Sequence, residues 1–148
     1  MKYFAYGSNM NIKRMEQRGV TVFKRAKACL FGYTLRFNKT TYTFGGAGHA
    51  NIVENENELV QGILYEIDNN GIFNLDKYES YPVEYDRRLM SVILKNGVEK
   101  EAYVYIAQPT RTSDDLIPTK EYLSHLLCAE GLLSADYMSR LNTQKTID

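Results

Sequence analysis

The chain opens with Tyr3-Phe4-Ala5-Tyr6-Gly7-Ser8-Asn9-Met10, and this stretch decides how the fold begins. Residues 3–6 are aromatic or small, a pattern typical of a short buried strand. Glycine and two small polar residues then break the strand, and residues 11–18 resume with helical character. Such a junction presents several backbone N–H groups beside the positive end of a helix dipole, where a carboxylate or an oxyanion can bind. The alternative is an ordinary strand-to-helix turn, because the same residue types favour turns.

The composition predicts one globular domain over residues 1–148, with a polar tail from about residue 142 that we expect to fray. Hydrophobic residues make up 44% of the 148 residues and charged residues 24%, which argues against disorder. Eighteen basic and eighteen acidic side chains cancel. Because the net charge is zero, we expect no binding to nucleic acid or to an anionic membrane.

The two cysteines bear on metal binding and on disulfide bonding. Cys29 and Cys128 are far apart, and neither has a Cys or His at ligand spacing. We therefore expect no structural metal and no disulfide framework.

The opening apolar run is too short for a signal peptide, and no segment reaches membrane-spanning length, so the expected location is cytoplasmic.

Along the chain, strands outnumber helices. Patterning predicts strands at 26–37, 50–53 and 59–67, with a glycine-rich loop at 38–48 and a polar turn at 54–58. Asn96-Gly97 predicts a hairpin between strands 88–94 and 98–105. Residues 109–118 read as a loop, and helices are expected at 72–79, 120–129 and 134–141. Close antiparallel neighbours favour an α+β domain, with a small mixed β-barrel and flanking helices as the expected arrangement.

An acidic residue falls on the apolar face of the predicted helix at 72–79. At 100° per residue, Ile72 and Leu75 lie roughly 60° apart on the helical wheel, and Glu79 falls between them. Burial and the negative end of the helix dipole would both raise the pKa of this carboxyl group. A carboxyl group with a raised pKa can transfer protons near neutral pH. The alternative is an early end to the helix, with Glu79 in water.

Other candidate residues give weaker signals. Gly45-Gly46-Ala47-Gly48 lacks the Lys-Ser/Thr of a phosphate loop, and His49 and His125 have no partner at metal spacing. We expect Asp76 to be solvated or a local hydrogen-bond partner, and Glu84 and Asp86 to be exposed charges. The tyrosines are numerous, and Tyr85 and Tyr122 matter only if they face the same cavity as Gly7 and Glu79.

These features together resemble the γ-glutamylcyclotransferase family. The family's opening motif, Tyr-Phe-Ala-Tyr-Gly-Ser-Asn, is matched from Tyr3 to Asn9, and its Leu-Asp-x-x-Glu segment is matched by residues 75–79. Its later tyrosine and its Pro-x-x-x-Tyr correspond to Tyr85 and to Pro118 with Tyr122. The chain departs from the family pattern where Ser80 replaces a common glycine and where Leu133 replaces the proline of Gly-Leu-Pro.

The resemblance implies a small closed sheet with surrounding helices and a pocket at the Gly7-Ser8-Asn9 loop. It implies conversion of a γ-glutamyl compound to 5-oxoproline and a free amino acid or amine, without a metal or an organic cofactor. Glu79 would be the catalytic acid and base. The substrate-binding residues would be Tyr3, Tyr6, Gly7, Ser8, Asn9, Tyr85 and Tyr122.

Two rival interpretations remain open at this point. One is a cyclotransferase with a different leaving group, such as a γ-glutamylamine or another γ-glutamyl metabolite. The other is a non-catalytic small-molecule-binding domain with the same fold. The expected partner is a small molecule, and the protein would be a monomer or a homodimer.

Overall fold

Five strands close into a mixed β-barrel in the computed structural model, which describes residues 1–42 and 45–148. The strand order is β1-β3-β2-β4-β5, and a parallel contact between Tyr3 of β1 and Tyr103 of β5 closes the barrel. All other strand pairs are antiparallel. The strands are β1 (Lys2–Ala5), β2 (Val22–Thr40), β3 (Gly48–Ile67), β4 (Tyr85–Leu94) and β5 (Glu99–Ala107). The α+β class and the mixed barrel are confirmed.

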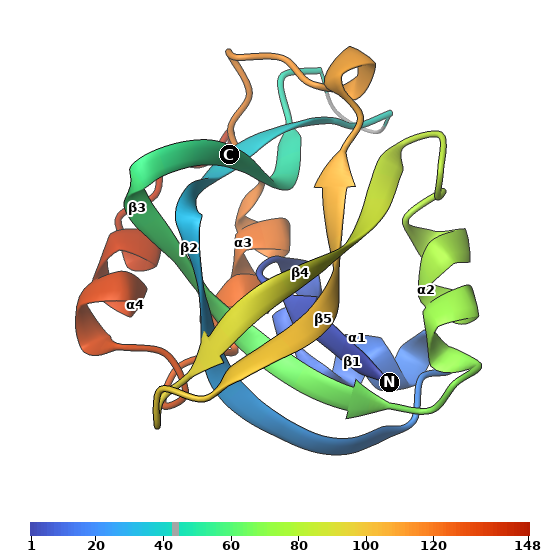
Figure 1. Ribbon diagram of the computed structural model, residues 1–148. Helices are drawn as coiled ribbons and strands as arrows, with labels where there is room; N and C mark the ends of the chain where they lie inside the picture. The colour runs from blue at the N-terminus through green and yellow to red at the C-terminus, as the bar shows by residue number, and fades with distance from the viewer. Residues whose placement is uncertain (43–44) are drawn as a thin grey trace.

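Short helices surround this barrel. Figure 1 shows α4 and α2 on opposite sides of it, with α3 between them behind the strands. The helices are α1 (Ile12–Gln17), α2 (Gly71–Tyr78), α3 (Lys120–Leu127) and α4 (Ala135–Asn142), with 3₁₀ turns η1 (Ser8–Met10) and η2 (Pro109–Arg111). Side-chain caps begin α3 and α4, where Thr119 accepts from the N–H of Tyr122 and Ser134 accepts from the N–H of Tyr137.

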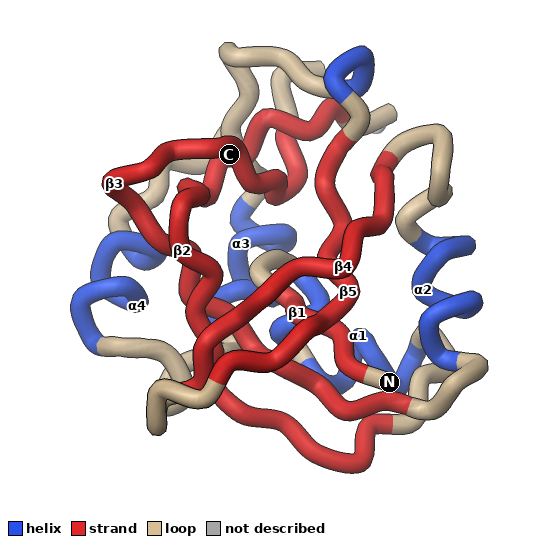
Figure 2. Tube along the Cα trace, viewed as in Figure 1, coloured by secondary structure: helices blue, strands red, loops and turns tan. Residues whose placement is uncertain are grey.

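The two long strands differ from the sequence-based prediction. The predicted strands at 50–53 and 59–67 are one continuous strand, β3, and the polar residues 54–58 do not end it. They are accommodated by a register shift between Phe31, which pairs with Leu59, and Tyr33, which pairs with Glu54. Figure 2 shows β2 and β3 as two long strands that curve around the molecule. The polar run was misread because a bulged segment carries the same residue types as a turn.

The predictions of a loop at 38–48 and of a frayed tail were also partly wrong. Residues 38–40 continue β2 and Gly48 begins β3, while residues 43 and 44 of that loop lie outside the described residues. In the tail, the N–H of Ile147 donates to the carbonyl oxygen of Pro118 at 3.0 Å. The carboxylate of Asp148 accepts from the N–H of Lys120 at 2.9 Å. The end of the chain is therefore bonded to the start of α3 instead of frayed.

The core fills the barrel and the space beneath the helices. Phe4 of β1, Tyr65 of β3 and Val92 of β4 are fully buried. Leu75 of α2 and Leu126 of α3 pack against the same core from outside. The four-residue strand β1 is therefore covered on both faces, which holds the loop that follows it in a fixed position.

Candidate active site

The loop after β1 is fixed by its close approach to β3. A Cβ atom on Gly7 would lie 3.0 Å from the Cβ atom of Ala50 and 3.3 Å from the hydroxyl oxygen of Tyr122. Both separations are tighter than ordinary van der Waals contact, so glycine lets the backbone approach the strand. The hydroxyl of Tyr65 donates to the carbonyl oxygen of Asn9 at 2.7 Å and holds the far side of the loop.

Three consecutive backbone donors of this loop are available to a ligand. The N–H groups of Met10 and Asn11 donate to the carbonyl oxygens of Gly7 and Ser8 at 3.0 and 3.1 Å. Within residues 1–42 and 45–148, the N–H groups of Gly7, Ser8 and Asn9 have no such acceptor. This arrangement agrees with the sequence pattern, while anion binding by the loop stays a prediction.

Glu79 is presented by the end of α2. It is the C-cap residue, and Ser80 follows in the left-handed conformation with φ +51°. The N–H of Tyr81 donates to the carbonyl oxygen of Asp76 at 2.9 Å, and the N–H of Ser80 donates to that of Lys77 at 3.3 Å. These two bonds form a Schellman motif, which normally has glycine where this chain has Ser80. The departure noted in the sequence therefore leaves the turn intact.

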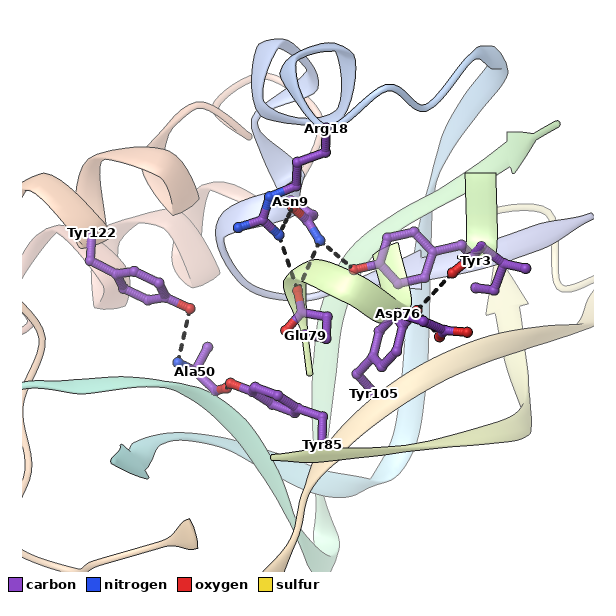
Figure 3. Close-up of polar contacts among 10 residues, drawn as sticks. Tyr3, Asn9, Arg18, Ala50, Asp76, Glu79, Tyr85, Tyr105 and Tyr122 are labelled. Carbon is purple, nitrogen blue, oxygen red and sulfur yellow. Dashed lines mark hydrogen bonds and ion pairs between the residues drawn. The ribbon is translucent and has the colours of Figure 1, made fainter. Parts of the chain in front are cut away.

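The Glu79 carboxylate meets the loop through a polar network (Figure 3). Its Oε1 atom accepts from Arg18 Nη1 at 3.1 Å and lies 3.4 Å from Asn9 Nδ2. Arg18 also donates to Asn9 Oδ1 at 3.0 Å, and Asn9 Nδ2 donates to the hydroxyl oxygen of Tyr3 at 2.9 Å. The strand, the loop, α1 and α2 thus meet around one carboxyl group.

Burial and charge act on Glu79 in opposite directions. Its side chain is only 16% exposed, and burial raises the pKa of the carboxyl group. The Arg18 guanidinium, and to a lesser degree Arg14 and Asn9, lower it. Burial is the larger effect, so the net pKa of Glu79 lies above its ordinary value, in the direction that the helical-wheel argument predicts.

Two of the predicted tyrosines are anchored on the same residue of β3. The Tyr85 hydroxyl donates to the carbonyl oxygen of Ala50 at 2.8 Å, and the Tyr122 hydroxyl accepts from the N–H of Ala50 at 3.0 Å. The Tyr6 hydroxyl donates to the carbonyl oxygen of Tyr105 at 2.6 Å. Tyr6 and Tyr85 therefore use their protons on the backbone and serve as rigid walls, while Tyr122 keeps a proton to donate.

The predicted site residues line one cavity of about 280 Å³. Glu79, the Gly7-Ser8-Asn9 loop and the four predicted tyrosines, Tyr3, Tyr6, Tyr85 and Tyr122, form its wall together. Tyr85 and Tyr122 therefore face the same cavity as Gly7 and Glu79, as a role in the site requires. The volume suits a small molecule the size of a dipeptide or smaller.

Other acidic residues differ from the sequence-based prediction. Glu84 was expected to be exposed, yet it is 8% exposed and lines the cavity. It forms ion pairs with Lys39 at 2.8 Å and with Arg111 at 3.1 Å, so its charge is compensated inside the protein. Asp86 is partly exposed and pairs with Arg88. Asp76 was expected to be solvated or to have a local hydrogen-bond partner. It accepts from the Tyr105 hydroxyl at 2.7 Å and pairs with Arg87, and these partners lie 29 and 11 residues away along the chain.

Sequence reasoning missed the basic residues of the cavity. Arg14 lies in α1, Arg18 is the C-cap residue of α1, and Lys39 lies near the end of β2. The spacing of Arg14 and Arg18, four residues apart, places them on one face of a helix, and that signal was present in the sequence. Nothing in the sequence indicated that this face is turned toward Glu79.

His49, which the sequence left as a packed or surface residue, also lines the cavity. Its ring stacks on Tyr122 with centroids 4.2 Å apart. Burial, reinforced by the charges of Lys39, Arg14 and Arg18, lowers the pKa of His49 to about 4. The imidazole is therefore neutral at physiological pH.

The part of the chain that the structure describes contains neither a metal-binding cluster nor a membrane-spanning helix. No cluster of three or more His, Cys, Asp or Glu side chains is placed there to hold a metal ion. None of the helices in those residues has the length and apolar character to cross a membrane.

Comparison with known proteins gives the family of the chain. A family model described as gamma-glutamyl cyclotransferase, AIG2-like, matches residues 3–124, a stretch that contains every predicted site residue. Gamma-glutamylcyclotransferase from Bos taurus is 27% identical over 154 residues, which cover 95% of this chain and 77% of the relative.

Solved structures share the fold. A gamma-glutamyl cyclotransferase superposes with a TM-score of 0.87 at 22% identity and covers 100% of this chain and 89% of that chain. A gamma-glutamyl cyclotransferase specific to glutathione, from yeast, superposes with a TM-score of 0.68 at 14% identity, covering 95% and 93% of the two chains. The barrel, its surrounding helices and the family match define the class, and the chain belongs to the gamma-glutamyl cyclotransferase, AIG2-like family.

Proposed function

We propose that this protein converts a γ-glutamyl amino acid to 5-oxoproline and the free amino acid. The observation that carries the proposal is the position of Glu79, a shielded carboxyl group with a raised pKa beside three unused backbone N–H groups. Family membership supports cyclotransferase chemistry in general. A cytoplasmic location is part of the same proposal and rests on the sequence alone.

The substrate supplies its own nucleophile in this reaction. The α-amine attacks the γ-carbonyl carbon, a five-membered ring closes, and the bond from that carbon to the leaving nitrogen breaks. Because the attack is intramolecular, the enzyme must hold the glutamyl chain folded and needs no protein nucleophile. The walls formed by Tyr6 and Tyr85 suit that task, since their hydroxyls are fixed on backbone carbonyls.

Glu79 transfers the proton that the reaction must move. The ionised carboxylate takes a proton from the α-ammonium group and makes the amine nucleophilic. The resulting carboxylic acid then donates that proton to the leaving nitrogen. As the ring forms, the attacking nitrogen also gives up its second proton, which the released amine takes up to leave as an ammonium group. A pKa raised by burial favours this cycle, and Arg18 keeps the carboxylate form accessible at the start of it.

The loop after β1 would bind the negative charges of substrate and transition state. The N–H groups of Gly7, Ser8 and Asn9 suit the α-carboxylate of the glutamyl half, and part of the same set can stabilise the tetrahedral oxyanion. Tyr122, whose hydroxyl accepts from Ala50, retains a proton for a second hydrogen bond to substrate. No step in this scheme requires a metal or an organic cofactor.

The decisive experiment compares wild type with Glu79→Gln on a panel of γ-glutamyl dipeptides, γ-glutamylamines and glutathione, with release of 5-oxoproline as the readout. Glutamine keeps the size of the side chain but cannot accept the proton. We expect turnover to fall by roughly 10²–10⁴-fold, the usual contribution of a general base. Substrate binding should change much less, because the loop holds the glutamyl half.

Glu16→Gln is the matched control, since Glu16 is an exposed carboxylate on α1 outside the cavity. It should leave turnover unchanged. If wild type released no 5-oxoproline from any compound but bound γ-glutamyl dipeptides, the protein would be a non-catalytic binding domain. A Glu79→Gln variant with near wild-type turnover would remove Glu79 from the mechanism.

A further inference from the structure

The charged side chains around the cavity are unequally paired. Three cations line it, Arg14, Arg18 and Lys39, against two carboxylates, Glu79 and Glu84. Arg18 pairs with Glu79 at 3.1 Å, and Lys39 pairs with Glu84 at 2.8 Å. One cation therefore remains uncompensated, and it is Arg14.

Arg14 has no ion-pair partner among the residues that the structure describes. Its Nε atom is buried and has no hydrogen-bond partner, and no carboxylate of residues 1–42 and 45–148 lies within ion-pair distance of its guanidinium. Glu121 faces the same region from α3 but does not reach ion-pair distance. A guanidinium with unused donors in a partly enclosed site is suited to a carboxylate, which it binds with two parallel hydrogen bonds.

The position of Arg14 relative to Glu79 indicates which part of the substrate it meets. Arg14 lies one helical turn before Arg18, which touches Glu79, so the two guanidinium-bearing side chains start about 6 Å apart. Arg14 also lines a second cavity of about 180 Å³, bordered by Tyr122 and His125, beside the first. A leaving group that extends from Glu79 toward this second cavity passes Arg14.

The chemistry of a γ-glutamyl amino acid fits that path. In the leaving half, a single carbon separates the scissile nitrogen from a carboxylate. A γ-glutamyl dipeptide carries two carboxylates and one ammonium group, so its net charge complements the one uncompensated cation. A γ-glutamylamine lacks the second carboxylate and would leave Arg14 unpaired, which is costly for a partly buried charge.

We propose that Arg14 is the specificity-determining residue of this site and binds the carboxylate of the leaving amino acid. The inference rests on the proposed cyclotransferase function and names its substrate class. It favours γ-glutamyl amino acids over γ-glutamylamines and over analogues whose terminal carboxylate is blocked.

The test pairs two substrates with three variants. γ-Glutamyl-alanine and γ-glutamyl-alaninamide differ only in the terminal carboxylate. Arg14→Gln removes the charge, Arg14→Lys keeps it without the paired donors, and Lys13→Gln removes a charge from an exposed position of the same helix. Production of 5-oxoproline gives kcat/KM for each combination, and activity on the amide reports whether each variant is folded.

Wild type should prefer γ-glutamyl-alanine, and Arg14→Gln should lower kcat/KM for it by roughly 10- to 100-fold, mainly through KM, as expected for lost hydrogen bonds to a charged group. Its kcat/KM for the amide should fall much less than that for γ-glutamyl-alanine, through the minor influence of Arg14 on the pKa of Glu79. Arg14→Lys should recover part of the preference, and Lys13→Gln should behave as wild type.

Two results would overturn the inference while the proposed function stands. Equal losses on both substrates would mean that Arg14 binds the glutamyl half, and no loss on either would mean that it contacts no substrate. If wild type released 5-oxoproline from neither compound, the proposed function itself would fail, and the inference would fail with it.

Discussion

At the scale of single residues, the proposed chemistry depends on the opposing effects of burial and Arg18 on the pKa of Glu79. Burial favours the neutral carboxylic acid, while the guanidinium at 3.1 Å favours the carboxylate. A general base must be ionised before it can accept a proton, so under the proposed mechanism we expect activity to fall as the pH drops through the pKa of Glu79. We therefore expect Arg18 to influence the pH range of the activity.

Arg18→Gln should shift the acidic limb of the pH dependence of kcat/KM to higher pH. The substitution removes the largest influence that lowers the pKa of Glu79 and leaves burial unopposed by it. Turnover near pH 6 should fall more than turnover near pH 8. Full pH–rate profiles of wild type and variant measure the shift.

Arg18→Lys provides the control, because it keeps a positive charge near the carboxylate and should retain most of the wild-type profile. An acidic limb that does not move in Arg18→Gln would show that another group, such as the substrate ammonium, sets it.

At the scale of secondary structure elements, the end of α2 determines where Glu79 points. The Schellman motif places Ser80 at φ +51°, a conformation that favours glycine. Residues other than glycine, asparagine and aspartate seldom adopt this conformation, because the Cβ atom crowds the following carbonyl oxygen. The family's usual glycine at this position therefore has a backbone reason, and this chain keeps the geometry at a cost in stability.

Ser80→Gly should increase the free energy of unfolding by about 0.5–1 kcal/mol. The left-handed conformation costs an ordinary residue roughly 1–2 kcal/mol, and the greater freedom of glycine in the unfolded chain offsets about 0.5–1 kcal/mol. Urea denaturation measures the change. Ser80→Ala, which keeps the strained conformation, should give no gain, and a gain equal to that of glycine would contradict the strain argument.

At the scale of the whole molecule, one buried charge cluster joins segments far apart in the sequence. Lys39 at the end of β2, Glu84 just before β4 and Arg111 in η2 form it, and the Tyr42 hydroxyl donates to Glu84 at 2.8 Å. Lys39 is 5% exposed, so its positive charge is shielded from water and is compensated by the Glu84 carboxylate. Hydrogen bonds from Lys39 and Tyr42 lower the pKa of Glu84.

Glu84→Gln should destabilise the protein by about 3 kcal/mol at pH 7, because it leaves the buried Lys39 ammonium without its carboxylate. The pKa of Glu84 is lower in the folded state than in the unfolded chain. Its contribution is therefore complete above the unfolded pKa and is lost as the pH falls through the folded pKa. The difference in thermal midpoint between wild type and variant should shrink from pH 7 toward pH 3.

Glu101→Gln is the matched control, since Glu101 is an exposed carboxylate on β5. It should change the midpoint little at either pH. A Glu84→Gln variant as stable as wild type at pH 7 would mean that the cluster contributes no net stability.

The local features of the fold could be predicted from sequence because they depend on neighbouring residues. The hairpin at Asn96-Gly97 is confirmed, with Gly97 at φ +84° as its turn requires. The helix containing Ile72 and Leu75 is confirmed within one residue at each end, and both side chains are buried. The break at Gly7 was equally local, since a glycine followed directly by two small polar residues favours a turn.

Tertiary structure decided which residues of distant segments meet. The sequence identified Glu79 by its place on a helix, but Arg18 and Asn9 reach it from segments 61 and 70 residues away. Glu84 looked exposed because a charged residue at the start of a strand is usually solvated, and only the ion pairs with Lys39 and Arg111 make its burial possible. Periodicity and turn chemistry are local and can be read in the sequence. The charge balance of the cavity depends on barrel closure, and so on contacts that local sequence does not encode.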